Sequence, residues 1–268
     1  MAAKILSGRL VRDQILNDLA ARVEKLKQKP TLAIVLVGDD PASAVYVREK
    51  EKAAASIGID FQLVKKPGNV KQNELEEIIG NLNQDKKVKG IVVQKPLPSH
   101  IDDEKIDLLV TPEKDVDGLH PASLFHPTTA QGVLKLLKEN NISISGKKVV
   151  VVGRSKLSGL PVAMRLLEED ATVTICHSKT ANLREETPQA DILVSAAGVP
   201  NLIGADMVKK GAVVVDIGTT RTRDGKLVGD VDFENVKNVA GYISPVPGGV
   251  GPMIVAGLMM NLVEASEK

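Results

Sequence analysis

The sequence predicts an α/β fold with two α/β domains, each built on a mostly parallel sheet. Short runs rich in valine and isoleucine alternate with longer amphipathic stretches, the pattern of strand–helix–strand units. The strand-like runs are apolar throughout, as expected where helices cover both faces of a sheet. A glycine-containing loop also joins a four-valine run to a predicted helix, as in Rossmann-type dinucleotide-binding domains.

The first half of the chain shows this alternation clearly. Its predicted elements are strand 31–37, helix 43–57, strand 61–64, helix 72–83 and strand 90–94. Ser43 is the expected N-cap of the first helix, and Gly58 is its expected stop signal.

The second half repeats the pattern after a predicted helix at 129–138. Its predicted elements are strand 148–152, helix 160–169, strands 171–175, 192–195 and 212–216, and a last helix at 252–265. We therefore expect one domain over residues 1–140 and a dinucleotide-binding domain over 141–251. The last helix, within 252–268, is expected to pack back on the first domain.

Composition and charge exclude several classes of partner. The 268 residues carry 35 Lys and Arg against 34 Asp and Glu, a net charge of +1, which argues against a nucleic-acid partner. No run approaches the roughly 18 apolar residues of a membrane span, and the first residues lack the apolar region of a signal peptide. The single cysteine, Cys176, fits a reducing compartment, so we expect a cytoplasmic protein without a membrane partner.

The loop after strand 148–152 is a candidate phosphate-binding loop. Gly153, Ser155 and Gly159 lie between a buried strand and a helix, where a pyrophosphate can meet the positive helix end. The spacing is not G-x-G-x-x-G, so an ordinary tight turn remains an alternative at this point. Residues 174–179 contain no acid for a ribose 2′-hydroxyl, and Arg154 and Ser178 favour NADP, with NAD possible.

A second group of candidate residues lies in the first half. Tyr46 and Lys50 share one helix face, and Gln94 ends a predicted buried strand, where α/β enzymes place site residues. The loop 115–118 can be read as an acidic turn or as part of a site. The four histidines show no metal-site spacing, so no metal is expected.

Six motifs carry a family resemblance. They are Tyr46-x-x-x-Lys50, Val93-Gln94-x-Pro96-Leu97-Pro98, Lys114-Asp115-Val116-Asp117-Gly118, Gly153-Arg154-Ser155, Cys176-His177-Ser178-x-Thr180 and Pro245-Val246-Pro247-Gly248-Gly249-Val250-Gly251-Pro252-Met253. In this order the motifs resemble the bifunctional methylenetetrahydrofolate dehydrogenase/methenyltetrahydrofolate cyclohydrolase family over nearly the whole chain.

The resemblance implies two activities at one site. The first oxidises 5,10-methylenetetrahydrofolate to 5,10-methenyltetrahydrofolate with NAD(P), and the second hydrolyses that product to 10-formyltetrahydrofolate. It also implies two domains flanking a cleft, a homodimer formed through the cofactor domains, and a place in one-carbon metabolism and purine biosynthesis.

The resemblance also implies residue roles. Lys50 is expected to be the catalytic lysine, with Gln94 as its hydrogen-bonding partner and Tyr46 as a stacking wall for the folate. Asp117 is expected to anchor the pterin, with Pro247, Gly248, Gly249 and Pro252 lining the cleft. The expected cofactor-binding residues are Gly153, Arg154, Ser155, Gly159, His177, Ser178, Gly198, Ile217, Gly218 and Thr219.

The residues suit this chemistry, and some positions depart from the family pattern. A lysine with a lowered pKa can move the protons that hydrolysis requires. Lys95 stands where an apolar residue is usual, and either tunes Lys50 or points to solvent. The loop between Gly118 and Gly132 is shorter than usual, while Thr220 and Ile254 replace a usual Asn and Thr.

Other functions stay open at this point. A dehydrogenase with little cyclohydrolase activity is the main alternative. A folate- or nucleotide-binding protein without turnover is disfavoured by the joint presence of Tyr46, Lys50, Gln94 and Asp117. A shikimate-type dehydrogenase would lack the Pro-Val-Pro-Gly-Gly-Val-Gly-Pro run. A short-chain dehydrogenase would carry its glycine loop before the Tyr-x-x-x-Lys pair.

Overall fold

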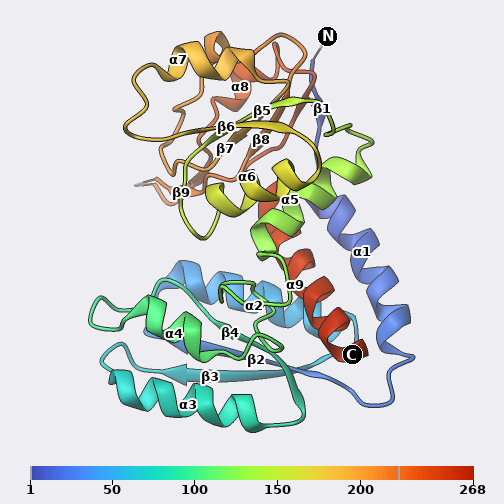
Figure 1. Cartoon of the computed structure of the whole chain (residues 1–268), viewed down its shortest axis with the longest axis vertical. Coiled ribbons are helices and arrows are strands. Elements are labelled where there is room, and N and C mark those ends of the chain that lie inside the picture. The colour runs from blue at the N-terminus through green and yellow to red at the C-terminus, as the bar shows by residue number, and fades with distance from the viewer. Residues whose placement is uncertain (1, 223) are drawn as a thin grey trace. The chain divides into compact units, whose positions relative to one another are not determined.

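The computed structural model describes residues 2–222 and 224–268, and the chain divides into two compact units (Figure 1). We call Gln14–Thr128 with Val255–Lys268 the three-stranded unit. Met1–Asp13 with Thr129–Ile254 form the six-stranded unit. Each unit combines helices with a parallel sheet, so the predicted fold class is confirmed.

Every predicted element is present, with bounds at most two residues from those expected. The α-helices are α1 (Gly8–Val23), α2 (Pro41–Ser56), α3 (Gln72–Gln84), α4 (Asp103–Leu109), α5 (Thr128–Glu139), α6 (Gly159–Glu168), α7 (Leu183–Glu186), α8 (Phe233–Val236) and α9 (Val250–Glu267). The strands are β1 (Lys4–Ile5), β2 (Thr31–Val37), β3 (Asp60–Lys66), β4 (Val88–Val93), β5 (Lys148–Val152), β6 (Thr172–Cys176), β7 (Ile192–Ser195), β8 (Val213–Asp216), β9 (Thr220–Arg221), β10 (Leu227–Val228) and β11 (Tyr242–Ile243).

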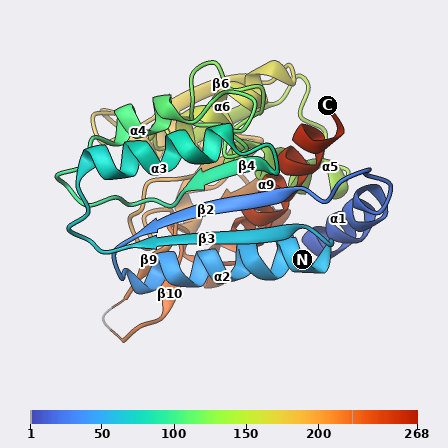
Figure 2. The same cartoon turned by 90° about the horizontal axis from the view of Figure 1, so that it is seen from below.

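The three-stranded unit is a small parallel sheet with the order β3-β2-β4. Helices α3 and α4 cover one face and α2 covers the other (Figure 2). The core between the sheet and α3 is aliphatic, with Ala33, Val35, Leu75 and Ile79 all buried. Parallel strands end at the same sheet edge, and Gln94 follows β4 at this edge.

The six-stranded unit is a wholly parallel sheet with the order β1-β11-β8-β7-β5-β6. The chain passes from β5 to its neighbour β6 on one side, and then to β7 on the other. The carboxyl ends of β5 and β7 therefore form a topological switch point, which is where open α/β sheets bind ligands.

The unit boundaries differ from the expected division at residue 140. The strand β1 pairs with β11, so the first residues join the six-stranded unit, and α5 belongs to that unit as well. Two-residue strands carry no readable periodicity, which is why β1 and β11 were not predicted. Helices α1 and α4 were also missed, although Val11, Ile15 and Leu19 give α1 a buried face.

The start of α2 also corrects a prediction. Asp40, not Ser43, is the N-cap: its carboxylate accepts a hydrogen bond from the Ser43 amide at 2.7 Å. Pro41 occupies the first helical turn, where its missing N–H is harmless. Across the described ranges, no helix is long and apolar enough to cross a membrane.

Candidate active site

Lys50 is a buried lysine at the centre of the predicted catalytic group. Helix α2 places Tyr46 one turn before it, half-buried, while Lys50 itself is only 5% exposed. The Lys50 Nζ donates to Gln94 Oε1 at 3.0 Å. The Gln94 Nε2 donates to the Lys95 carbonyl at 2.8 Å, which fixes the amide so that its oxygen faces Lys50. The structure thus brings Lys50 and Gln94 together, with Tyr46 one helical turn from Lys50.

Burial changes the acid–base chemistry of Lys50. Desolvation lowers the pKa of the Lys50 ammonium below its usual value, and the nearby Asp117 carboxylate partly opposes this. The neutral amine therefore becomes accessible nearer to neutral pH, as a general base requires.

Asp117 lies in the loop after α4 and is held by neighbours that sequence reasoning missed. The Thr128 Oγ1 donates to Asp117 Oδ1 at 2.8 Å, and the Thr128 amide donates to the Asp117 carbonyl at 3.2 Å. Asn261 on α9 donates to the Val116 carbonyl at 2.9 Å and the His126 carbonyl at 3.0 Å. Asp117 Oδ2 receives no hydrogen bond from the described residues, so it is available to a ligand.

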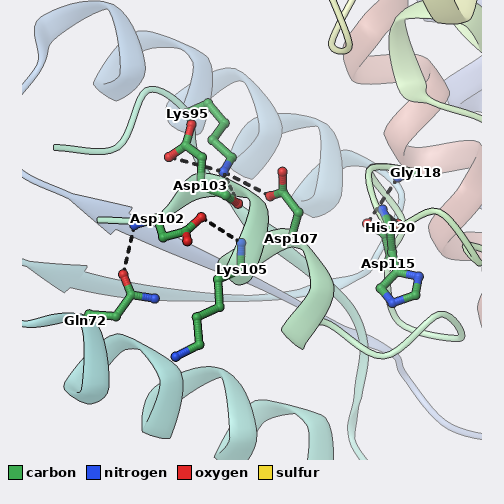
Figure 3. Close-up of polar contacts among 9 residues, drawn as sticks. All are labelled: Gln72, Lys95, Asp102, Asp103, Lys105, Asp107, Asp115, Gly118 and His120. Carbon is green, nitrogen blue, oxygen red and sulfur yellow. Dashed lines mark hydrogen bonds and ion pairs between the residues drawn. The ribbon is translucent and has the colours of Figure 1, made fainter. Parts of the chain in front are cut away.

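The other charged residues of the Lys114–Gly118 motif shape the loop. The buried Asp115 carboxylate accepts from the Gly118 amide at 3.2 Å and the His120 amide at 2.8 Å (Figure 3). Lys114 donates to carbonyls at the end of α3, including Leu82 O at 3.0 Å. Asp115 and Lys114 therefore hold the turn that presents Asp117.

Lys95 neither points to solvent nor adds an unpaired charge beside Lys50. Its Nζ lies 2.9 Å from Asp107 Oδ1 and 3.5 Å from Asp103 Oδ1, and its side chain is 12% exposed (Figure 3). Burial raises the pKa of the Asp107 carboxyl, and Lys95 opposes that shift. The positive charge of Lys95 is thus balanced by two carboxylates on α4.

The predicted phosphate loop lies at the switch point of the six-stranded sheet. Gly153 follows β5 with φ of 118°, and a Cβ there would collide with the Ala196 carbonyl oxygen after β7. A Cβ on Gly159 would collide with the Gly153 carbonyl oxygen, so α6 can approach the strand only at glycine. Arg154 and Ser155 are exposed on this loop. A cradle closed to any Cβ at a helix N-terminus fits a dinucleotide pyrophosphate.

The remaining cofactor candidates occupy the loops after β6, β7 and β8. His177 and the exposed Ser178 follow β6, where the His177 amide donates to Thr180 Oγ1 at 2.8 Å. Gly198 follows β7, while Ile217, Gly218 and Thr219 follow β8. All of these loops stand at the carboxyl edge of one sheet, where the topology favours a ligand.

The proline- and glycine-rich segment 245–253, which ends in the first turn of α9, belongs to the six-stranded unit. Pro247 is exposed, Gly248 and Pro252 are half-buried, and Gly249 is buried. The Gly8 amide donates to the Gly248 carbonyl at 3.0 Å, so this segment packs on the start of α1. Its role in substrate binding stays a prediction. Within the described residues, no group of three His, Cys, Asp or Glu side chains could hold a metal ion.

Family models match both parts of the chain. The tetrahydrofolate dehydrogenase/cyclohydrolase catalytic domain matches residues 6–117, and the NAD(P)-binding domain of the same family matches residues 127–268. The chain belongs to the tetrahydrofolate dehydrogenase/cyclohydrolase family. The family expected from the six motifs is therefore confirmed, together with its two activities and its NAD(P)-binding domain.

Individual members of the family are similar to this chain over nearly their full length. The chain is 52% identical to a bifunctional protein FolD of Exiguobacterium sibiricum, covering 99% of this chain and 100% of that protein. It is similar to the crystal structure of the Campylobacter jejuni bifunctional enzyme FolD, with 43% identity, a TM-score of 0.96 and 99% of both chains covered. The Trypanosoma brucei FolD structure, complexed with NADP and an inhibitor, is 39% identical with a TM-score of 0.96, covering 100% of this chain and 98% of that one.

Proposed function

We propose that this chain oxidises 5,10-methylenetetrahydrofolate with NADP and hydrolyses the methenyl product to 10-formyltetrahydrofolate, with Lys50 as the catalytic lysine. The observation that carries the proposal is the buried Lys50 amine, hydrogen-bonded to Gln94 and close enough to Asp117 for their charges to interact. A lysine kept out of water suits proton transfer, and a carboxylate with a free oxygen suits the pterin.

Asp117 is the proposed anchor of the pterin. The 2-amino group and the N3–H of a pterin are adjacent donors, and a carboxylate accepts such a pair with charge-assisted hydrogen bonds. The Thr128 hydroxyl donates a hydrogen bond to Asp117 Oδ1, and this bond orients the carboxylate before substrate arrives. Tyr46 supplies an aromatic wall on the helix that carries Lys50. Pro247, Gly248, Gly249 and Pro252 are further proposed substrate-binding residues.

The oxidation requires positioning more than acid–base catalysis. When bound, NADP would supply the acceptor for the hydride that leaves the methylene carbon of the substrate. The C–H bond breaks with its electron pair, and the carbon is left as a cation stabilised by two nitrogen lone pairs. Because no proton leaves an alcohol, the oxidation needs no base, and no proton transfer is assigned to Lys50 in this step.

The hydrolysis places three proton transfers with the reacting molecule on Lys50. As water adds to the methenyl carbon, the neutral Lys50 amine takes one proton from it. As the ring C–N bond then breaks, the Lys50 ammonium returns a proton to the departing nitrogen. The neutral amine formed in this way accepts the proton of the hydroxyl group. One proton is finally released to solvent, so 10-formyltetrahydrofolate and a proton result from the cation and water. Gln94 Oε1 holds the amine in place throughout.

A direct assay tests this function. Purified protein is mixed with methylenetetrahydrofolate and either NADP or NAD, while NAD(P)H and methenyl absorbance are followed together. We expect NAD(P)H to form without lasting accumulation of the methenyl compound. Reduction with steady methenyl accumulation would favour a dehydrogenase alone, and no reduction with either cofactor would contradict the proposal.

The preference for NADP is supported by the end of β6. Arg154 and Ser178 are exposed at the cofactor edge of the sheet, and residues 177–180 contain no acid. An acid there would repel a 2′-phosphate, whereas Arg154 can pair with it. The Trypanosoma brucei relative complexed with NADP has the same overall fold.

A homodimer through the six-stranded unit is supported by an exposed apolar stripe. Leu160, Met164 and Leu167 lie on one face of α6 and are 38%, 48% and 51% exposed. Neighbouring β6 is an edge strand. Apolar stripes beside an open strand edge are typical of surfaces that a second chain covers.

We further propose that the enzyme is cytoplasmic. Its product, 10-formyltetrahydrofolate, would supply formyl groups for transfer reactions, as in purine biosynthesis.

Light scattering after size-exclusion chromatography tests the dimer. Met164→Asp places a charge at the centre of the α6 stripe and is expected to give a monomer at concentrations where the parent is dimeric. The control is Leu10→Asp, because Leu10 is 68% exposed on α1 outside this stripe. A monomeric parent, or a Met164→Asp variant that remains dimeric, would contradict this interface.

A further inference from the structure

Two buried carboxylates hold the loops after β7 and β8, and the proposed reaction uses neither. Asp230 is fully buried and Asp216 is 3% exposed. Throughout the described part of the chain, neither has a lysine, arginine or histidine partner. Burying a carboxylate without a cation is costly unless hydrogen bonds replace its hydration. The donors around each carboxylate therefore decide what the pair does.

Asp230 gathers the loop that follows β7. Its Oδ2 accepts from Ser195 Oγ at 3.0 Å, the Ala197 amide at 2.7 Å and the Gly198 amide at 3.2 Å. Its Oδ1 accepts from the Val199 amide at 2.9 Å. Three successive amides thus wrap one carboxylate, and this fixes the path of residues 196–199.

Asp216 joins Asp230 to the loop that follows β8. Its Oδ1 accepts from the Gly218 amide at 2.9 Å and the Asp230 amide at 3.1 Å. Its Oδ2 accepts from the Val231 amide at 2.9 Å. The Asp230 backbone is therefore held by the side chain of Asp216. Asp216 is the last residue of β8, and residues 217–219 follow it directly.

Two glycines show how closely these loops are fitted. A Cβ on Gly218 would collide with the Asp230 carboxylate, and a Cβ on Gly229 would collide with that of Asp216. Gly218 is thus required by Asp230, whatever it contributes to a cofactor. The two carboxylates lock the β7 and β8 loops to one another.

From this geometry we infer that Asp230, supported by Asp216, is a positioning residue for the dinucleotide. It sets the loops carrying Gly198, Ile217 and Gly218, so that the cofactor meets a preformed surface at the carboxyl ends of β7 and β8. The inference rests on the proposed function only in taking these loops as the cofactor site. It assigns no proton transfer to either carboxylate.

The test separates cofactor binding from folate chemistry in one protein. Asp230→Asn keeps the side-chain shape but turns an amide nitrogen toward backbone N–H donors. We expect the NADP dissociation constant, measured by calorimetry, and the NADP KM to rise at least about tenfold, roughly 1.4 kcal/mol. Hydrolysis of supplied methenyltetrahydrofolate consumes no NADP, so the kcat and KM of hydrolysis should stay within about twofold of the parent values. General misfolding would instead lower both the oxidation and the hydrolysis activity.

A milder variant provides the same test if Asp230→Asn does not fold. Ser195→Ala removes one of the four donors to Asp230 and is expected to weaken NADP binding by roughly threefold, about 0.65 kcal/mol. Thr187→Val is the matched control, because Thr187 is another fully buried hydroxyl of this unit and donates to the Leu183 carbonyl at 3.1 Å. It should leave NADP binding unchanged.

The outcomes distinguish this inference from the proposed function. Unchanged NADP binding in Ser195→Ala, or equal losses in Ser195→Ala and Thr187→Val, would overturn the positioning role. A parent that binds NADP but oxidises no methylenetetrahydrofolate would contradict the proposed function instead, and the calorimetric comparison would still decide the role of Asp230.

Discussion

Lys50 in the three-stranded unit and Asp230 in the six-stranded unit are both buried ionisable side chains, but their surroundings differ. Among the described residues, the Lys50 amine has one hydrogen-bond partner, Gln94 Oε1. The Asp230 carboxylate accepts four hydrogen bonds from Ser195 and three consecutive amides. The Lys50 amine is left available for a reacting molecule, whereas the Asp230 carboxylate is occupied by one hydroxyl and three backbone amides of its own unit.

The difference shows that burial can give an ionisable side chain either a catalytic or a structural role. With few partners, desolvation lowers the pKa of Lys50 and makes its amine a base. With many donors, a buried carboxylate becomes a fixed point around which loops are folded. Saturation of hydrogen bonds, more than burial itself, separates the catalytic residue from the positioning residue.

The largest expected effect is the loss of hydrolysis in Lys50→Met. Methionine keeps most of the apolar stem and removes the amine, so the contribution of general acid–base catalysis, about 10²–10⁴-fold, should disappear from kcat. Oxidation should fall less, because it needs no base, and methenyl product should accumulate. The paired assay of both steps on the folded variant measures this.

Lys95→Met is the matched control for that substitution. Lys95 is also largely buried, but its charge is paired with Asp107 and Asp103. Its loss should leave hydrolysis within a few-fold of the parent. Parent-like hydrolysis in Lys50→Met would remove Lys50 from the reaction, and equal loss of both steps would make it a positioning residue for oxidation as well.

Asp117→Ala should produce the next largest effect. Losing a charge-assisted hydrogen bond to the pterin costs about 1.5–3 kcal/mol, so folate KM should rise roughly tenfold or more. NADP KM should change little, because Asp117 lies in the three-stranded unit. Asp103→Ala, at an exposed carboxylate of α4, is the control. An unchanged folate KM would leave Asp117 as a purely structural turn residue.

The two units should also respond to pH in opposite directions. Burial lowers the pKa of Lys50 below 10.5, so the folded state holds fewer protons and stability should rise as pH rises toward 10.5. Burial raises the pKa of Asp216 from 3.8 to about 7, against three amide donors that lower it, so stability should fall as pH rises across that range.

Unfolding free energies measured against pH test these signs. The parent should gain stability relative to Lys50→Met as pH approaches 10.5, and lose stability relative to Asp216→Asn between about pH 4 and 7. Slopes of the same sign for both pairs would refute the contrast between the two buried sites.

The smallest expected effect is on cofactor choice. Arg154→Ala should weaken NADP binding by roughly three- to tenfold, as expected for an exposed charge on phosphate, and should change NAD binding less. The ratio of kcat/KM for the two cofactors reports this. Equal losses for NADP and NAD, or a parent that prefers NAD, would contradict the role of Arg154.

The sequence predicted much of the fold because its strands are long apolar runs. The bounds of β2, β5 and β7 match the prediction, and the glycines at 153 and 159 lie where the predicted strand–helix connection required them. The two-residue strands and the true unit boundary depend on pairing between distant segments, as of β1 with β11, and local periodicity does not encode that.

The candidate site was predictable only in part, for the same reason. Lys50, Gln94 and Asp117 follow from motifs, whereas Thr128 holds Asp117, and Asn261 holds the neighbouring Val116 carbonyl, through contacts made only after folding. The ion pairs of Lys95 with α4 and the wrapping of Asp230 by the β7 loop likewise join segments without a shared local signal. Position in three dimensions, not residue type, gives these residues their roles.

Direct titration of Lys50 tests the central claim that burial with a single partner makes this lysine a base. Protein carrying ¹³C at the lysine ε-carbons is followed by NMR across pH, with the Lys50 signal assigned by its absence in Lys50→Met. The account predicts a midpoint below 10.5 for Lys50. In Asp117→Asn the midpoint should move lower still, because an opposing negative charge is lost. A Lys50 midpoint at or above 10.5 would contradict the account.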